Sequence, residues 1–191
     1  MLALTVKSVI LMRKVEVVPH NPKWRDAFAA EKQQIWQVFG DNLVAIHHIG
    51  STAIPDIYAK PIIDLLVEVK AIAKTDQYNL SMEALGYEAM GEFGIPGRRY
   101  FRKNNAAGVR THHVHTFEVG KPEVEKHLAF RDYMIVHLED AQQYSNLKRE
   151  LARKYPYDIH SYMDGKNQFI QQMNEKAAKW RESQKIDWYI P

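Results

Sequence analysis

The stretch LVAIHHIGSTAIPDIYAKPIIDLLVEV, residues 43–69, decides the fold of this chain. It holds two runs of apolar and β-branched residues, Leu43–Ile49 and Ile62–Val69, of the length that strands have. Near-continuous apolar runs of this kind are typical of strands in a buried sheet. The first run ends in Gly50-Ser51-Thr52, and the segment after it is long enough only for a helical turn and a loop. The stretch therefore predicts two strands of a mostly buried sheet with a short connection.

Outside this stretch, strand patterns give way to helix patterns along the chain. A short strand is expected at 15–18, and Asn21-Pro22 with the apolar stripe after it predicts a helix that ends at Gly40. The further expected elements are a helix at 75–85, strands at 87–92, 98–103 and 110–119, and helices at 123–138, 140–154 and 161–180. Strands first and helices last predict an α+β fold with a helical C-terminal part.

Length and composition predict one globular domain. The chain has 191 residues, of which 46% are apolar, and it shows no repeat or low-complexity tract. Residues 12–191 are expected to form this single domain. Residues 1–11 are expected to be an N-terminal extension, either disordered or the product of a misassigned start at Met1 in place of Met12.

Charge and cysteine content exclude several classes of protein. The 26 Lys and Arg against 23 Asp and Glu give a net charge of +3, so a nucleic acid is not expected as the main partner. The chain has no Cys, which excludes disulfide scaffolds, thiolate zinc sites and Cys nucleophiles. The apolar run at 9–12 is too short to span a bilayer and has no basic start. A cytoplasmic protein without a membrane partner is therefore expected.

The Gly50-Ser51-Thr52 turn and Asp64 are the first candidates for a binding site. Glycine permits close approach of the backbone, and hydroxyls and free N–H groups at such a turn bind phosphate oxygens; a strand end with a helix cap is the structural alternative. Asp64 interrupts an apolar strand, where an unpaired carboxylate is costly to bury. It is either a divalent-metal ligand or general base, or the partner of Lys60, Arg98 or Arg99. Glu68 lies about 13 Å along the strand, too far to share one ion with Asp64.

His113 and His115 alternate in a predicted strand, so both imidazoles leave the same face about 7 Å apart. This spacing suits two ligands of one metal ion or two donors to one phosphate, and cross-strand packing or exposure is the structural alternative. A third metal ligand would come from Asp64, His47 or His48.

The densest basic patch is Arg98-Arg99-Tyr100-Phe101-Arg102-Lys103. Strand alternation sends Arg99 and Lys103 to one face and Arg98 and Arg102 to the other. The patch is either a phosphate clamp or the protective charge of an edge strand. Farther along, Arg131-Asp132 is interpreted as an ion pair and Lys166 as a surface residue.

Several ordered motifs resemble the GrpB-like family over residues 13–180. The matching motifs are His48-Ile49-Gly50-Ser51-Thr52-Ala53-Ile54-Pro55, Ala59-Lys60-Pro61-Ile62-Ile63-Asp64, Gly97-Arg98-Arg99-Tyr100-Phe101, His112-His113-Val114-His115, His127-Leu128-Ala129-Phe130-Arg131-Asp132-Tyr133, Leu147-Lys148, and Tyr162 with Lys166 and Phe169-Ile170. That family is assigned to the nucleotidyltransferase superfamily and also occurs fused to dephospho-coenzyme A kinases.

The resemblance implies a nucleotidyltransferase-like mixed sheet flanked by helices. It also implies phosphate binding at the Gly50-Ser51 turn and carboxylates that hold magnesium. The usual second strand acid is absent, because Leu66 stands two residues after Asp64. This departure puts catalysis in question, and the family has no settled biochemical activity.

The leading hypothesis is a divergent nucleotidyltransferase-like protein that binds a nucleotide or another phosphorylated small molecule. Its catalytic and metal-binding residues would be Asp64, His113 and His115, and its phosphate-binding residues Gly50, Ser51, Thr52, Lys60, Arg98 and Arg99. The expected cofactor is a divalent ion, magnesium or manganese first and zinc as the alternative. The rival functions are a non-catalytic module that binds a nucleotide or coenzyme A precursor, and a hydrolase whose metal ion is held by histidines. The sequence does not determine the oligomeric state.

Overall fold

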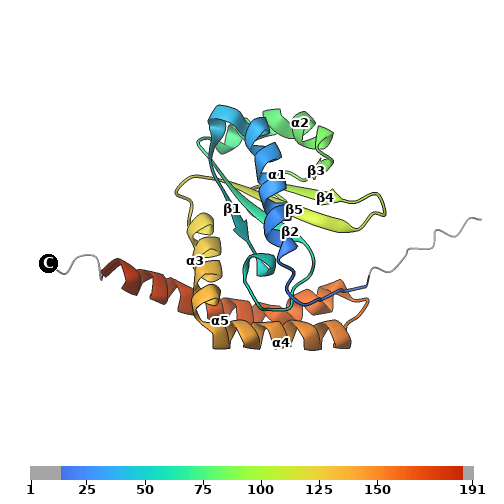
Figure 1. The fold of residues 1–191 in the computed structure, drawn as a ribbon. Coiled ribbons are helices and arrows are strands. Elements are labelled where there is room, and N and C mark those ends of the chain that lie inside the picture. Colours follow the sequence, from blue (N-terminus) through green and yellow to red (C-terminus); the bar gives the residue numbers. More distant parts are fainter. Residues whose placement is uncertain (1–13, 187–191) are drawn as a thin grey trace, which may run out of the picture.

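The computed structural model describes residues 14–186, so the predicted extension at 1–11 lies outside the described residues. Figure 1 shows a sheet with helices against it and a layer of two long helices at one end. The strands are β1 (Leu43–Ile49), β2 (Ile63–Val69), β3 (Tyr87–Ala89), β4 (Arg99–Asn104) and β5 (Arg110–Glu118). The α-helices are α1 (Lys23–Phe39), α2 (Asn79–Ala84), α3 (Pro122–Val136), α4 (Leu138–Lys154) and α5 (Ile159–Ile186).

The sheet is mixed, with the order β1-β2-β5-β4-β3. β2 and β5 run parallel, and the other neighbouring pairs are antiparallel. The predicted α+β class, the mixed sheet with flanking helices and the helical C-terminal part are confirmed. No helix in the described range 14–186 is both long and apolar enough to cross a membrane.

Two of the predicted elements differ from the structure. The strand expected at 15–18 is reduced to one bridge between Val18 and Ala59, because the rest of this segment has no strand beside it. The helix expected at 75–85 is a 3-10 helix, Ile72–Tyr78, followed by the short α2. Thr75 is fully buried in that 3-10 helix, so tertiary packing rather than helical periodicity shapes the segment.

The two faces of the sheet are covered differently. One face packs against α1 and α2 in the largest apolar core, which includes Leu65, Val67, Phe101 and Val114. The other face carries Asp64, Leu66, His113 and His115, which the register aligns on neighbouring strands. On that face α3 covers a smaller apolar cluster. Helices α4 and α5 lie beyond the end of the sheet where β1 stops (Figure 1).

Candidate functional site

The turn after β1 places the backbone of Gly50 against the side chain of Asp64. Gly50 has a φ of 69°, in the left-handed region that glycine tolerates. A β-carbon at this position would also collide with the Asp64 carboxylate. The register pairs Ile49 with Asp64 across β1 and β2, which sets the turn at this point. The structure thus brings together the Gly-Ser turn and the strand acid that the sequence marked separately.

Asp64, His113 and His115 form one cluster on the sheet face beside this turn. The Nδ1 of His113 lies 2.9 Å from Asp64 Oδ1 in a hydrogen bond. The Nε2 of His115 lies 3.9 Å from the same oxygen. Burial would raise the pKa of Asp64, but the two imidazoles hold that pKa well below its usual value. Asp64 is therefore a carboxylate at neutral pH, with histidines rather than Arg98 or Arg99 as its partners.

The cluster fits one divalent ion with mixed nitrogen and oxygen donors. One candidate ligand atom from each of its three residues lies within 4.8 Å of the other two. Leu66, which is fully buried, occupies the strand position where a second acid would stand. A pair of magnesium ions held by oxygens alone does not fit these residues, because Mg²⁺ prefers oxygen ligands. Manganese and zinc accept imidazole together with carboxylate.

The remaining candidates for a third metal ligand have other partners. His47 Nε2 lies 2.8 Å from Glu68 Oε1, on the same face but farther along the sheet. His48 Nε2 lies 3.0 Å from Thr52 Oγ1. Burial is the main cause that lowers the pKa of His48 to about 4, so this ring is neutral at pH 7. Asp64 is thus the residue that joins His113 and His115.

Thr52 turns its hydroxyl away from the Asp64 cluster. Its Oγ1 donates to the carbonyl of Ile62 at 3.2 Å and is bonded to His48. The side chain is 3% exposed and lines a different surface cleft, beside Phe28 and Arg131. Its predicted role as a phosphate ligand is thus unsupported by its position, and the hydroxyl instead ties the turn to the connection before β2.

The two arginines predicted to bind phosphate point to opposite faces. Arg99 makes a bidentate ion pair with Asp76, at 2.6 and 2.8 Å, on the face opposite to Asp64. Arg98 is 6% exposed and lies on the Asp64 side, with Nη1 3.4 Å from His115 Nδ1. Strand alternation explains the separation. Arg98 therefore joins the site through His115, and Arg99 does not reach it.

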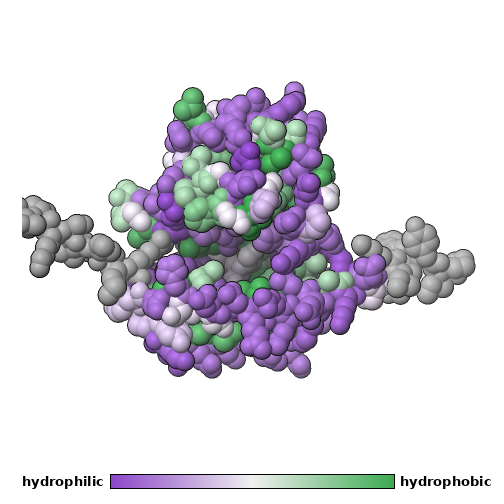
Figure 2. Space-filling view, turned by 180° about the vertical axis from the view of Figure 1, so that it is seen from behind, coloured by the Kyte–Doolittle hydropathy of each residue, from purple (hydrophilic) through white to green (hydrophobic). Residues whose placement is uncertain are grey.

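A cavity of about 200 Å³ opens beside Asp64, and helices α4 and α5 supply five of its eleven lining residues. Figure 2 shows an indentation between the sheet body and the helical layer on this mostly hydrophilic surface. The residues that line the cavity are Gly50, Ser51, Lys60, Ile62, Asp64, His113, Tyr144, Lys148, Tyr162, Met163 and Lys166. Asp64 is the only acidic residue among them in the described part of the chain.

Three lysines surround the tyrosines of this cavity. Lys148 Nζ lies 4.2 Å from the centre of the Tyr144 ring, and Lys166 Nζ lies 4.7 Å from that of Tyr162. Lys60 Nζ approaches the Tyr162 ring at 5.8 Å. Lys148 is 2% exposed and its Nζ has no hydrogen-bond partner within residues 14–186, and the same is true of the Tyr162 hydroxyl. A buried ammonium group without a hydrogen-bond partner is costly, and an anion in the cavity would offset that cost.

The lysines affect one another's protonation. Burial, together with the charge of Lys166, lowers the pKa of Lys148 to about 7. Burial and the charge of Lys60 lower the pKa of Lys166 to about 8, against the opposing effect of Asp64. A bound anion would reverse both shifts, because it favours the charged form of each lysine.

Lys166 is only 8% exposed. The interpretation of Lys166 as a surface residue is therefore wrong. The helical spacing in the sequence indicates that both lysines lie on the inner faces of their helices. Lys148 falls in the buried stripe of α4 with Ala141, Tyr144 and Leu151. Such spacing places a residue on the inner face of a helix, where a lysine is unusual.

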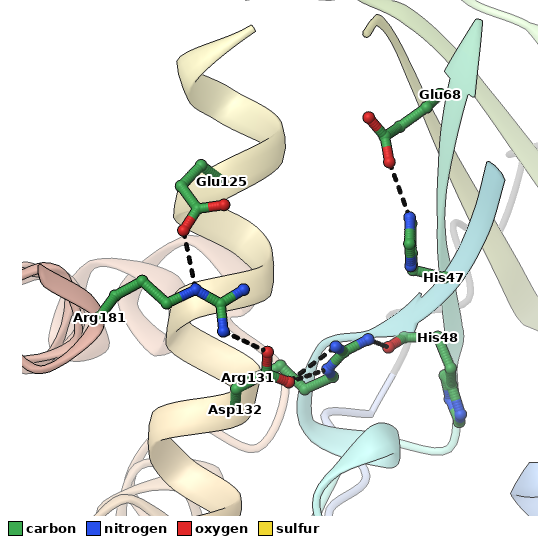
Figure 3. Close-up of polar contacts among 7 residues, drawn as sticks. All are labelled: His47, His48, Glu68, Glu125, Arg131, Asp132 and Arg181. Atoms are coloured by element: carbon green, nitrogen blue, oxygen red, sulfur yellow. Dashed lines mark hydrogen bonds and ion pairs between the residues drawn. The ribbon is translucent and has the colours of Figure 1, made fainter. Parts of the chain in front are cut away.

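A chain of charged groups connects α5 to the Gly-Ser turn (Figure 3). Arg181 donates to Glu125 and to Asp132, at 2.8 and 3.0 Å. Asp132 in turn accepts from Arg131 at 2.7 Å, which confirms the predicted ion pair. Arg131 Nη1 donates to the His48 carbonyl at 3.0 Å, two residues before Gly50. These contacts hold the end of β1 against α3.

The family model for GrpB protein matches residues 14–176 of this chain. The chain belongs to the GrpB family. It is similar to UPF0157 protein YqkA of Bacillus subtilis, with 46% identity over 94% of this chain and 52% of that protein. It is 34% identical to glutamate-rich protein GrpB of Alkalihalophilus pseudofirmus, over 84% of this chain and 94% of that protein. The chain thus spans about half the length of YqkA.

A solved member of the family has the same fold. The crystal structure of conserved protein GrpB from Enterococcus faecalis matches with a TM-score of 0.83 and 41% identity, over 87% of this chain and 99% of that one. A dephospho-CoA kinase of Mycolicibacterium paratuberculosis is 24% identical over 88% of this chain, which corresponds to 47% of that protein.

Proposed function

We propose that this chain binds a phosphate-bearing small molecule, a nucleotide or a coenzyme A precursor, in the cavity between Asp64 and the lysines of α4 and α5. The observation that carries the proposal is Lys148, a buried ammonium group whose Nζ has no hydrogen-bond partner in the described chain. Lys60 and Lys166 add positive charge to a cavity with one acid. Several phosphate oxygens would satisfy these donors together.

We further propose that the chain transfers a phosphoryl or nucleotidyl group of this ligand. The oxygen of an acceptor hydroxyl forms a bond to phosphorus and releases its proton to solvent, while the bond from phosphorus to the bridging oxygen breaks and the nucleoside diphosphate or pyrophosphate leaves. The lysines neutralise the charge that collects on the leaving phosphate. Ser51 and Gly50 line the same cavity, and they would orient the phosphate.

Asp64, His113 and His115 would hold a divalent ion, for which manganese or zinc suits the donor set better than magnesium. When bound, the ion supplies positive charge next to the phosphoryl oxygens. The relative that is a dephospho-CoA kinase acts on a coenzyme A precursor, which supports including such precursors among the candidate ligands.

A binding module without turnover is the second candidate function, and Leu66 in place of a second acid favours it. Both candidate functions need the same ligand site. The chemical state of the ligand after incubation with the protein therefore distinguishes them. Saturable binding with unchanged ligand supports the module, and an altered ligand supports transfer.

The test is a thermal-shift screen of nucleotides, coenzyme A precursors and sugar phosphates, each with magnesium, manganese, zinc or a chelator. A ligand at one hundred times its Kd stabilises the folded state by about 2.7 kcal/mol. We expect a metal-dependent shift that Asp64→Ala abolishes. Asp76→Ala is the matched control, because Asp76 pairs with Arg99 on the opposite face. No shift with any phosphate compound would contradict the proposal.

A further inference from the structure

Arg98 is a buried cation without an acidic partner in the described residues, and it is 6% exposed. Its Nε donates to the Glu92 carbonyl at 3.2 Å, and its Nη2 donates to the Phe93 carbonyl at 2.7 Å. The guanidinium stacks over the Tyr100 ring at 4.8 Å. One turn of the chain therefore fixes the group from two sides and leaves Nη1 directed at His115.

The contact with His115 determines where this ring carries its proton. Arg98 Nη1 lies 3.4 Å from His115 Nδ1. A guanidinium has only donors, so the neutral ring must accept at Nδ1 and carry its proton on Nε2. The Nε2 atom is the one that faces Asp64 Oδ1 at 3.9 Å, which suits a proton there. The contacts of both ring nitrogens, with Arg98 and with Asp64, thus favour the same tautomer.

That tautomer conflicts with metal binding through Nε2. A metal ion needs the lone pair of Nε2, so the proton would have to move to Nδ1. The Nδ1 proton would then face the N–H of Arg98, donor against donor. His115 can enter the ligand set through Nε2 only after the guanidinium moves away.

We propose that Arg98 is a positioning residue that holds His115 in the Nε2-protonated form and keeps it out of the ligand set of the divalent ion. The inference rests on the proposed metal site at Asp64. Its consequence is that the protein has two arrangements of the site. In one, His115 is a hydrogen-bond donor beside Asp64, and in the other Arg98 has left and His115 binds the ion.

The turn that holds Arg98 lies at the surface, which allows such a change. Phe93 is 55% exposed, and its ring stacks on Tyr100 at 5.2 Å. Gly97 N donates to Glu92 Oε1 at 2.7 Å within the same turn. Movement of this short turn would withdraw both carbonyls that anchor Arg98 without disturbing the strands.

The first test uses the metal-free wild type and long-range ¹H–¹⁵N correlation spectra of the histidine rings, with His115→Gln to identify the signals of His115. We expect the Nε2-protonated tautomer for His115. In Arg98→Met, which keeps an apolar stem but no donor, the Nδ1-protonated form should gain population, although Asp64 still favours a proton on Nε2. Arg102→Met is the matched control, because the Arg102 guanidinium pairs with Glu88 at 2.6 and 2.8 Å rather than with His115. A wild-type His115 protonated on Nδ1 would overturn the proposal without any variant.

The second test is titration with Co²⁺ and Zn²⁺, read by absorption and calorimetry rather than activity. Groups that orient metal ligands change affinity by about 10- to 100-fold, so Arg98→Met should bind Co²⁺ tighter by about that factor. Equal affinity in wild type and Arg98→Met would overturn the proposal. If neither protein nor the Arg102→Met control binds any ion, the proposed metal site fails instead, while the tautomer of His115 still decides the role of Arg98.

Discussion

The two faces of strand β2 differ in what they bury. Leu65 and Val67 point to the face under α1 and are fully buried in the largest apolar core. Asp64, in the same strand, points to the other face and meets two imidazoles and a cavity with three lysines. Hydroxyl groups on the first face, such as that of Thr116, also lack a hydrogen-bond partner within residues 14–186, but the unpartnered group beside the cavity, Lys148 Nζ, can carry a charge. Under the proposed function, a buried charge of this kind is the cost in stability of a face that binds a ligand.

The largest expected effect is on the apolar face. Leu65→Ala should lower the free energy of unfolding by about 2–5 kcal/mol, because it removes a fully buried side chain and leaves a cavity. Asp64→Asn, a change to its neighbour on the other face, should cost less stability, because the amide oxygen can still accept from His113 Nδ1, but it should abolish metal-dependent ligand binding. Urea denaturation of the two variants measures the contrast. Equal losses of stability in the two variants would show that Asp64 stabilises the fold as much as a core residue does, which would contradict a role in ligand binding alone.

Removal of a cavity lysine should weaken phosphate binding and, without ligand, raise the stability of the folded protein. Lys148→Met should weaken phosphate binding by about 10- to 100-fold, since hydrogen bonds to charged groups contribute about 1.5–3 kcal/mol. Without ligand, the variant should be more stable by about 1 kcal/mol, because an uncompensated buried charge is gone. Calorimetry and urea denaturation measure the two effects. Lys154→Met, on the exposed side of α4, should change neither.

Phosphate affinity should fall as the pH rises. Lys148, whose pKa is about 7, loses most of its charge between pH 6 and 8, which should lower affinity about 10-fold. Stability of the ligand-free protein should change in the opposite direction. Above pH 7 the unfolded chain still binds the lysine proton that the folded chain has lost, so stability rises with pH toward 10. A Lys148→Met protein that keeps the full pH dependence of affinity would contradict this assignment.

The smallest expected effect is at Arg99. Arg99 pairs with Asp76, whose side chain is about half exposed to solvent. Because exposed ion pairs contribute little, Arg99→Ala should lower the free energy of unfolding by about 0.2–1 kcal/mol. Phosphate and metal affinity should be unchanged, because Arg99 lies on the face opposite to the cavity. A clear loss of phosphate affinity in titration calorimetry would mean that Arg99 reaches the ligand in the bound state.

The part of the site built on the sheet could be predicted from sequence. Gly50 and Asp64 stand out because glycine and a lone acid interrupt apolar runs, and strand periodicity alone puts His113 and His115 on one face. The same rule separates Arg98 from Arg99. Strand periodicity could not tell whether Arg98 or Arg99 shares a face with Asp64, because that depends on the pairing of β2 with β5 and of β5 with β4.

The helical half of the site could not be predicted in the same way. Periodicity identifies the inner face of α4 and α5, but not the surface against which each face packs. Gly165 of α5 lies against Leu151 of α4, where a β-carbon would collide. This close approach helps to bring Lys148 and Lys166 to one cavity, and it is a tertiary contact between residues in different helices. The sequence could show that both lysines interrupt buried stripes, but not that they meet beside Asp64.

The central claim is that the lysines of α4 and α5 and the Asp64 cluster form one ligand site. A crystal structure of the protein with inorganic triphosphate and Mn²⁺ tests it most directly. We expect phosphate oxygens within hydrogen-bond distance of Lys148 Nζ, with an anomalous manganese peak beside Asp64. A cavity that stays free of phosphate at saturating triphosphate, with the anion bound elsewhere on the molecule, would contradict it.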